Sequence, residues 1–236
     1  MSEDLASLKK QIMHEIYQKR MLLTSLRDRG EGWTLISGLW SPFYIQLRLL
    51  SSFPETLSKV GKAMSRLLED EAPEVNKIVG VAFAGVPIAT AIAIESGLPA
   101  CHTRKMVGAR TEDELQRAIQ EYGQHSMLEG VIEDGDSLCI VDDLVTRMES
   151  KLVARAQILA EVVRRNVRNV SCDHVAVVID REQGAKERAG EFNLKLHSLI
   201  GFVEEGLSLV ADLMTQEEHS LISEYLSDPK KYQKNE

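Results

Sequence analysis

Apolar segments of strand type alternate with helical patterns between Lys77 and Leu199, and this alternation constrains the fold more than any other feature of the chain. The expected strands are 77–83, 98–103, 137–141, 174–179 and 194–199, and the expected helices are 87–96, 151–166 and 182–189. Strands that alternate with helices form parallel sheets, because each helix returns the chain to the same edge. The segment therefore predicts an α/β fold with a doubly wound, mostly parallel sheet.

The flanking segments predict smaller elements. A helical pattern runs from about Leu5 to Leu26, and two short strands around a turn are expected at 34–38 and 42–47. An amphipathic helix is expected over 53–69, with Pro54 in its first turn, where a missing N–H costs little. Two further helices are expected near 203–214 and 216–226.

Composition excludes several classes of protein. A chain of 236 residues with 44% hydrophobic composition can bury one large core. The formal charge of −8 argues against a general nucleic-acid binder, and no apolar run approaches the roughly 20 residues of a membrane span. The acidic start Met1–Asp4 lacks the layout of a secretory signal. Cys101, Cys139 and Cys172 are odd in number and lie in or beside apolar strand patterns, so we expect buried free thiols and a reduced cytoplasmic compartment.

Two adjacent carboxylates, Asp142 and Asp143, follow the apolar run Leu138–Val141, and a helical pattern begins near Ser150. Ligands of open parallel sheets bind beyond the carboxyl ends of the strands. Paired aspartates there suit the hydroxyls of a ribose, or a hydrated Mg²⁺ that bridges sugar and phosphate. The alternative is a solvated strand end or a helix cap. Because like charges repel at the end of a buried strand, the pattern favours a ribose site with indirect metal contact.

Three other strand ends carry groups suited to anions. The turn Phe83–Pro87 joins a strand to a helix and offers backbone N–H groups at a helix N-terminus. The same geometry is a tight structural turn, and the two interpretations coexist. Arg104 and Lys105 follow the next strand, either as a pyrophosphate contact or as a solvated strand end. Arg181 follows a third strand, where its guanidinium suits a planar carboxylate or pairs with a neighbouring acid.

Five segments in order resemble the orotate phosphoribosyltransferase family of type I phosphoribosyltransferases. They are Ile36–Arg48, Val81–Ala89, Arg104–Lys105, Leu138–Ser150 and Asp180–Gly184. The resemblance covers roughly residues 35–200. It implies a type I phosphoribosyltransferase-like α/β sheet with a small hood, and transfer of a 5-phosphoribosyl group from phosphoribosyl pyrophosphate to orotate, with Mg²⁺, in pyrimidine nucleotide synthesis. It also implies a homodimer whose flexible loop reaches the partner's active site.

The resemblance assigns roles to individual residues. The catalytic positions are Asp142, Asp143 and Lys105, and the substrate-binding positions are Arg104, Phe83, Ala84, Gly85, Thr146, Arg147, Ser150 and Arg181, the last of which contacts orotate. It further implies a single domain, in which about 1–50 form an N-terminal helix and hood hairpin and about 51–236 form the core. Within the core, a polar excursion over 106–129 opens with a capping-box pattern at 111–114 and is a candidate lid. Its alternative is a surface helix without function.

The chain departs from the family pattern at three places. Ile36 and Gln120 stand where the family has lysines, and Met148–Glu149 replace small residues or glycine. Thr146 and Glu149 have capping-box spacing, so the glutamate would compete with a phosphate for helix N–H groups. These departures leave a second hypothesis open, a non-catalytic protein that binds phosphoribosyl pyrophosphate or a nucleotide as a regulator. The retained Arg104, Lys105 and Arg181 favour the enzyme.

Overall fold

The computed structural model describes residues 4–35, 38–105, 114, 117 and 125–232. The chain divides into two compact units, which are residues 1–49 with 202–236 (unit 1) and residues 50–201 (unit 2). The predicted lid over 106–129 lies outside the described residues up to residue 124, apart from Glu114 and Arg117. In the described part of the chain, no helix combines the length and the apolar character needed to cross a membrane.

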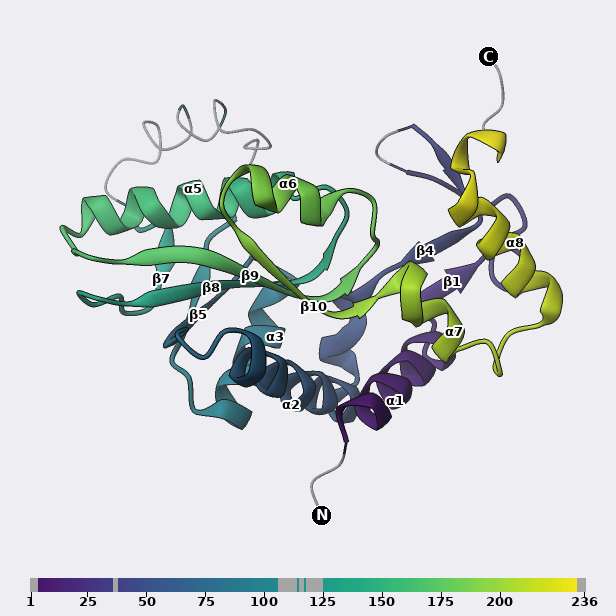
Figure 1. Ribbon diagram of the computed structural model, residues 1–236, viewed down its shortest axis with the longest axis horizontal. Helices are drawn as coiled ribbons and strands as arrows, with labels where there is room; N and C mark the ends of the chain where they lie inside the picture. The colour runs from purple at the N-terminus through teal and green to yellow at the C-terminus, as the bar shows by residue number, and fades with distance from the viewer. Residues whose placement is uncertain (1–3, 36–37, 106–113, 115–116, 118–124, 233–236) are drawn as a thin grey trace. The chain divides into compact units, whose positions relative to one another are not determined.

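Unit 2 is built on a six-stranded sheet with helices on both faces (Figure 1). The strands, in spatial order, are β10 (Lys195–Gly201), β9 (Ser171–Asp180), β8 (Ser137–Val145), β5 (Lys77–Gly80), β6 (Ala100–Thr103) and β7 (Leu128–Glu129). Every pair is parallel except the last, where β7 runs antiparallel to β6. Helices α2 (Pro54–Glu71) and α3 (Gly85–Ser96) cover one face, and α5 (Glu149–Arg164) and α6 (Ala185–Glu191) cover the other. The predicted doubly wound α/β sheet is confirmed.

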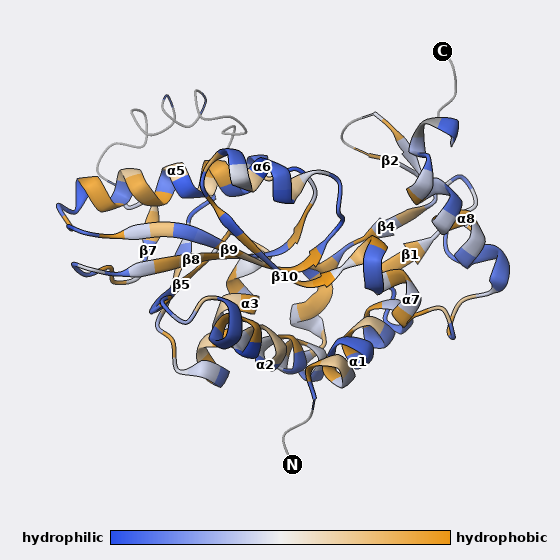
Figure 2. Cartoon of the chain, in the orientation of Figure 1, coloured by the Kyte–Doolittle hydropathy of each residue, from blue (hydrophilic) through white to orange (hydrophobic). Residues whose placement is uncertain are grey.

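The helices of unit 2 lie within three residues of their predicted bounds at each end, and two of the ends are marked by residues that favour them. Pro54 opens α2, and Gly97 ends α3 in the left-handed conformation at φ 77°. In Figure 2, α2 alternates polar and apolar residues, since only one of its faces packs into the protein. A 3-10 helix over Leu47–Ser52 precedes α2.

Three glycines set how closely these elements pack. A Cβ on Gly61 of α2 would lie 2.8 Å from the Ala91 carbonyl oxygen of α3. A Cβ on Gly80 of β5 would lie 2.8 Å from the Gly85 carbonyl oxygen, and one on Gly85 would lie 2.2 Å from the Val141 carbonyl oxygen. Side chains at these positions would therefore push α3 away from both α2 and the sheet.

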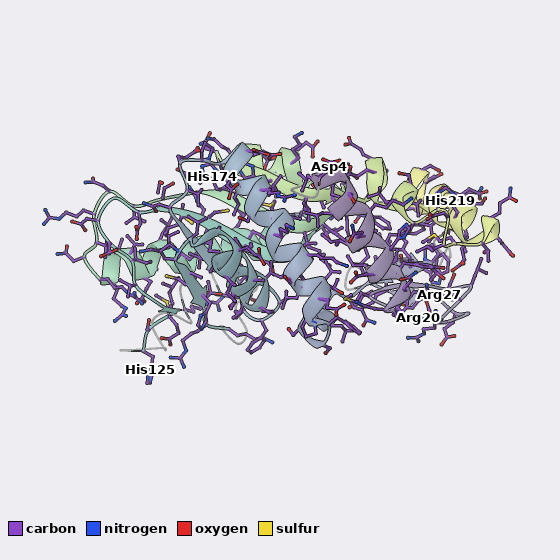
Figure 3. All side chains as sticks on the ribbon, turned by 90° about the horizontal axis from the view of Figure 1, so that it is seen from below. Asp4, Arg20, Arg27, His125, His174 and His219 are labelled. Carbon is purple, nitrogen blue, oxygen red and sulfur yellow. The ribbon has the colours of Figure 1, made fainter. Side chains whose placement is uncertain are left out.

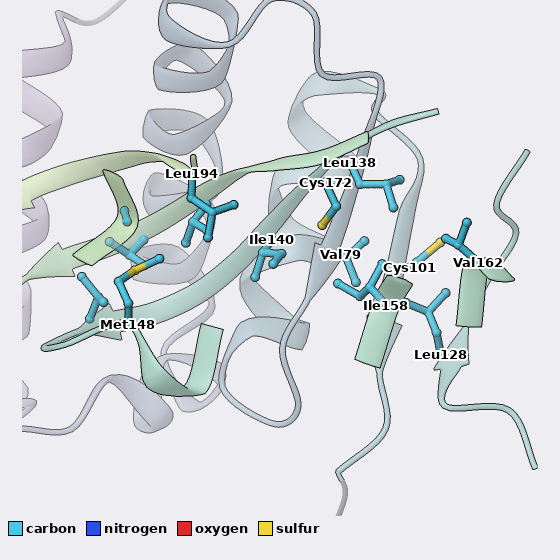
Figure 4. Close-up of a cluster of buried hydrophobic side chains, with 14 of the residues drawn as sticks. Val79, Cys101, Leu128, Leu138, Ile140, Met148, Ile158, Val162, Cys172 and Leu194 are labelled. Carbon is cyan, nitrogen blue, oxygen red and sulfur yellow. The ribbon is translucent and has the colours of Figure 1, made fainter. Parts of the chain in front are cut away.

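The core between the sheet and α5 holds two of the cysteines, Cys101 and Cys172, among aliphatic side chains (Figure 4). All three cysteines are buried and free, as predicted. Burial raises the pKa of Cys172 to about 12, and it also raises the pKa values of Cys101 and Cys139. These thiols are therefore packing groups rather than nucleophiles.

A buried histidine pair ties α2 and the turn after it to β9 and β10. His174, marked in Figure 3, stacks on His197, and their facing ring nitrogens are 3.0 Å apart. The outer nitrogens contact Glu74 at 3.1 Å and Glu71 at 2.8 Å. Burial lowers the pKa of His174.

Unit 1 begins with α1 (Leu5–Gln18), which is shorter than predicted. The expected helix to Leu26 is wrong beyond Gln18, because Arg20 takes a left-handed conformation (φ 58°) and β1 (Leu22–Thr24) then pairs antiparallel with β4 (Phe43–Ile45). The two strands expected at 34–38 and 42–47 do not pair with each other. A separate small hairpin joins β2 (Trp33–Thr34) to β3 (Trp40–Ser41).

The C-terminal segment completes unit 1. The helix expected over 203–214 is wrong in its length, since a π-helical turn (Phe202–Gly206) and the short α7 (Leu207–Leu209) take its place. Helix α8 (Gln216–Ser227) follows, as predicted, and a 3-10 helix over Pro229–Tyr232 comes after it.

A capping box of Thr215 and Glu218 opens α8. The Glu218 carboxylate also accepts hydrogen bonds from Thr24 and Tyr17. The Arg27 guanidinium, labelled in Figure 3, lies 3.8 Å from the centre of the Tyr17 ring. These contacts join the N-terminal and C-terminal segments within unit 1.

The close contact at Gly85 yields a prediction about stability. Gly85→Ala should lower the free energy of unfolding by about 1–3 kcal/mol or more, because the new methyl group meets the backbone of β8 and cannot move aside. Gly190→Ala in α6 is the matched control, since nothing lies within 4 Å of its Cβ position. It should raise stability by about 0.5–1 kcal/mol. Urea unfolding of both variants tests this, and equal stabilities would contradict the close-packing argument.

Candidate active site

The carboxylate pair lies within strand β8 rather than after it. The strand was expected to end at Val141, but it continues to Val145 because Asp142 stays paired with Val177 of β9. On the other side, pairing with β5 stops at Gly80 and Val141. The two aspartates therefore lie at the carboxyl edge relative to β5, which is where ligands of parallel sheets bind.

Short hydrogen bonds fix both aspartates. Asp142 Oδ1 accepts the Asp143 N–H at 2.9 Å, and Asp143 Oδ1 accepts the Leu144 N–H at 2.8 Å. Burial, together with repulsion from Asp142, raises the pKa of Asp143 to about 6. Asp143 therefore changes charge near neutral pH, far above the usual range of an aspartate.

Lys151 is the site residue that sequence reasoning missed. Its Nζ lies 2.7 Å from Asp142 Oδ2, and its side chain is only 5% exposed. It occupies the first turn of α5, where the positive end of the helix dipole disfavours a cation. The one signal in the sequence is a lysine a few residues after an acidic strand end, and by itself it does not distinguish Lys151 from a surface lysine of the helix.

The turn Phe83–Gly85 lies directly against the aspartates. A Cβ on Gly85 would be 3.2 Å from Asp142 Cα, and the Val81 N–H donates to the Val141 carbonyl at 2.9 Å. The Ala82–Phe83 peptide is cis. Within the turn, the Gly85 and Val86 N–H groups donate to the carbonyls of Val81 and Phe83. In the described turn, the N–H groups of Phe83 and Ala84 are left without a backbone acceptor.

The basic pair after β6 reaches the same region. Lys105 Nζ lies 5.3 Å from the centre of the Phe83 ring, and the Phe83 side chain is 70% exposed. Helix α5 fixes the backbone beside it, because Gln157 Nε2 donates to the Arg104 carbonyl at 2.8 Å and to the Met127 carbonyl at 2.6 Å. The Arg104 guanidinium is 3.5 Å from Glu129. The structure thus brings Lys105 to the turn that follows β5.

Arg181 lies beside the end of β8. Its N–H donates to the Val145 carbonyl at 3.0 Å, one residue after Val145 and Asp180 pair in the sheet. The Asp180 carboxylate accepts the Glu182 N–H at 2.8 Å, and burial raises the Asp180 pKa. The side chain predicted to contact the base therefore starts from the same sheet edge as the aspartates.

The turn between β8 and α5 differs from the predicted capping box. Helix α5 begins at Glu149 with Met148 as its N-cap, and no side chain caps the helix. The prediction of a cap between Thr146 and Glu149 is therefore wrong, and Glu149 is exposed. Met148 has φ 70°, a conformation that favours glycine, and its side chain is 1% exposed in the core (Figure 4). The chain thus keeps a left-handed backbone conformation, which favours glycine, at a position occupied by a buried methionine.

Some of the positions singled out from the sequence lie together in the structure, and others lie outside the described residues. The structure brings together on unit 2 the aspartate pair, the turn at Phe83, Lys105, the turn before α5 and the start of Arg181. Ile36 and Gln120 lie outside the described residues. Among the described residues, no three His, Cys, Asp or Glu side chains converge as metal ligands. Mg²⁺ sites commonly combine one or two carboxylates with substrate phosphates, which suits this edge.

Comparisons with known proteins identify the family. A scan against protein-family models gave no match. The chain is 34% identical over 187 residues to the orotate phosphoribosyltransferase of Methanocaldococcus jannaschii, a match that covers 78% of this chain and 94% of that one. The chain belongs to the orotate phosphoribosyltransferase family. The resemblance drawn from the five sequence segments is confirmed, and the family is one of enzymes.

Solved structures agree on the fold of this orotate phosphoribosyltransferase relative. The UMP synthase of Leishmania donovani matches with a TM-score of 0.73 at 22% identity, over 93% of this chain and 42% of that chain. The Mycobacterium tuberculosis orotate phosphoribosyltransferase, in complex with 5-phospho-α-D-ribosyl 1-diphosphate, matches with a TM-score of 0.56 at 21% identity, over 82% and 96%. The type I phosphoribosyltransferase-like fold predicted from sequence is confirmed.

The left-handed Met148 yields a prediction with two opposing effects. Met148→Gly relieves a backbone conformation whose cost is about 1–2 kcal/mol, but it also removes a fully buried side chain. Loss of a buried methionine costs about 2–5 kcal/mol, so the variant should be less stable overall. Met148→Ala loses most of the side chain without the backbone relief, and it should be the less stable of the two. Chemical unfolding measures both, and a Met148→Gly protein more stable than wild type would contradict the argument.

The raised pKa of Asp143 predicts how stability depends on pH. A carboxyl whose folded-state pKa is raised binds its proton more tightly when folded. Its contribution to stability is therefore present below about pH 4 and is lost as pH rises through about 6. Asp143→Asn, which is always neutral, should be more stable than wild type at pH 8, and the gap should shrink by pH 5. Asp70→Asn, on an exposed position of α2, is the control. A gap that widens on acidification would contradict the assignment.

Proposed function

We propose that the chain is an orotate phosphoribosyltransferase that joins the 5-phosphoribosyl group of phosphoribosyl pyrophosphate to orotate and releases pyrophosphate, as a step of pyrimidine nucleotide synthesis. The observation that carries the proposal is one sheet edge. There the carboxylate pair, the turn at Gly85 and the chain at Arg181 come together, in a chain 34% identical to a relative of that name.

The reaction is a substitution at the anomeric carbon of the ribose. A nitrogen of orotate forms a bond to that carbon while the bond to the pyrophosphate oxygen breaks, through a state of oxocarbenium character. Asp143 accepts hydrogen bonds from the ribose hydroxyls and places negative charge beside the developing positive charge. The protein contributes mainly by orienting the two reactants and excluding water.

Two groups of donors are proposed to hold the phosphates. The N–H groups of Phe83 and Ala84, beside Gly85, face the pyrophosphate together with Arg104 and Lys105. The turn before α5 receives the 5'-phosphate through Thr146, Arg147 and Ser150 and through the helix N-terminus. The first N–H groups of a helix lack intrahelical acceptors, which makes them available to an anion.

The donor set at the aspartates fits Mg²⁺. Carboxylate oxygens are preferred ligands of this ion, and Asp142 and Asp143 would hold it indirectly, through water or the ribose hydroxyls. When bound, Mg²⁺ neutralises charge that develops on the pyrophosphate. The residues of the chain itself orient the ribose.

Several broader features belong to the same proposal. The protein acts in the cytoplasm as a homodimer, with no membrane or nucleic-acid partner. It works as one phosphoribosyltransferase-like domain, with a hood drawn from the N-terminal hairpin and parts of the C-terminal third, and a lid over 106–129. The named relatives are enzymes, and no finding favours the non-catalytic regulatory alternative.

A pyrophosphate-release assay with phosphoribosyl pyrophosphate, Mg²⁺ and a panel of bases tests the function. Orotate should be the base that supports turnover. Failure of every base, with the protein folded and the donor bound, would contradict the enzymatic proposal and favour the regulatory one.

Arg181→Lys tests the position of the base. The variant keeps the charge but loses the planar fork, so orotate affinity with the donor present should fall by about 1–3 kcal/mol, the scale of a hydrogen bond to a charged group. Arg188→Lys is the matched control, since Arg188 pairs with Glu191 on the surface of α6. Equal orotate affinity in the two variants, measured by calorimetry, would remove Arg181 from the site.

A further inference from the structure

Lys151 is a buried cation whose hydrogen bonds are all made inside the protein. Its Nζ lies 2.7 Å from Asp142 Oδ2 and donates to the Leu144 carbonyl at 2.6 Å and to Ser150 Oγ at 3.3 Å. A lysine ammonium has three N–H donors, so these three acceptors use all of them. The ammonium is therefore held in one place against the ribose edge.

A lysine ammonium in this location would destabilise the fold without an oppositely charged partner. The side chain is 5% exposed and lies in the first turn of α5, close to the positive end of the helix dipole. A buried charge is strongly destabilising unless an opposite charge and further hydrogen bonds compensate it. Asp142, whose own side chain is 10% exposed, supplies that charge. The Lys151–Asp142 pair is therefore a fixed part of the folded site.

The salt bridge with Lys151 gives the two aspartates different surroundings. Both carboxylate oxygens of Asp142 are engaged, one by the Asp143 N–H and one by Lys151. Asp143 uses Oδ1 to accept the Leu144 N–H. Among the described residues, Asp143 forms no ion pair with a cation, and its other side-chain contact is with the Asp142 carboxylate. Asp143 is thus the carboxylate available to a ligand.

We propose that Lys151 is a positioning residue whose fixed charge serves as the permanent counter-ion of Asp142, so that Asp143 alone meets the ribose hydroxyls and the site binds free divalent cations weakly. The identification of the ligand as a ribose rests on the proposed function. The charge arrangement follows from the contacts of Lys151, Asp142 and Asp143 alone.

Counting charges gives the expected consequence. Ionised Asp142 and Asp143 with Lys151 carry a net charge of −1, because the lysine cancels one of two carboxylates. Without Lys151 the two carboxylates by themselves carry −2. Attraction of a divalent cation scales with this charge, and the interaction is strong at the effective dielectric of a protein surface. With Lys151 in place, the two carboxylates would therefore hold a free divalent cation only weakly.

The test measures Mn²⁺ binding to the full chain by electron paramagnetic resonance at pH 8, without donor or base. Lys151→Met should bind Mn²⁺ at least about tenfold more tightly than wild type, because the charge that repels the ion is gone. Lys77→Met is the matched control. Lys77 is equally buried and pairs with Asp136 at 2.6 Å, but at the opposite, amino end of the β5 and β8 strands. It should leave Mn²⁺ affinity unchanged.

A second pair of variants covers the case in which Lys151→Met fails to fold. Asp142→Asn leaves Asp143 and Lys151 with a summed charge of 0, and Asp142→Asn combined with Lys151→Met leaves −1 from Asp143. The combined variant should bind Mn²⁺ at least about tenfold more tightly than the single one. Equal Mn²⁺ affinity within either folded pair would overturn the proposal. Because neither orotate nor turnover enters the measurement, a protein inactive with every base would refute the proposed function and leave this result to be judged separately.

Discussion

The organisation of the active edge depends on one contact, the approach of Gly85 to the Val141 carbonyl of β8. Only a residue without a Cβ permits it, since a Cβ there would lie 2.2 Å from that oxygen. The contact places the start of α3 where β5 would otherwise have continued alongside β8. Asp142 and Asp143 therefore lose their neighbour on one side but keep β9 on the other. The two aspartates are therefore held by β9 at a position where β5 no longer covers the strand.

The pattern of residues predicted most of unit 2 because its signals are local and repeated. Strand and helix patterns alternate, Pro54 and Gly97 mark helix ends, and the segments resembling the family lie at strand ends. Elements of unit 1 were harder to predict, because they depend on partners distant in sequence. Leu22–Thr24 continues a helical pattern, but it is a strand because Phe43–Ile45 pairs with it.

Two features of the candidate site were beyond sequence reasoning for a different physical reason. The spacing of Thr146 and Glu149 suggests a capping box, but Met148 between them is the N-cap, and the burial of its side chain outweighs an unfavourable backbone angle. Lys151 resembles a surface lysine of an amphipathic helix, and only the three-dimensional approach of α5 to β8 makes it a partner of Asp142. In both cases tertiary packing overrides a local preference, which a linear pattern does not contain.

The amide of Gln157 has a consequence for the position of the basic pair. It donates to the carbonyls of Arg104 and Met127, residues that are far apart in sequence and that border the segment between them. One side chain on a rigid helix therefore holds the end of β6 and the start of β7 together, in addition to the pairing of those two strands. The position of the basic pair that follows β6 is thus set by contacts from α5 and from the sheet.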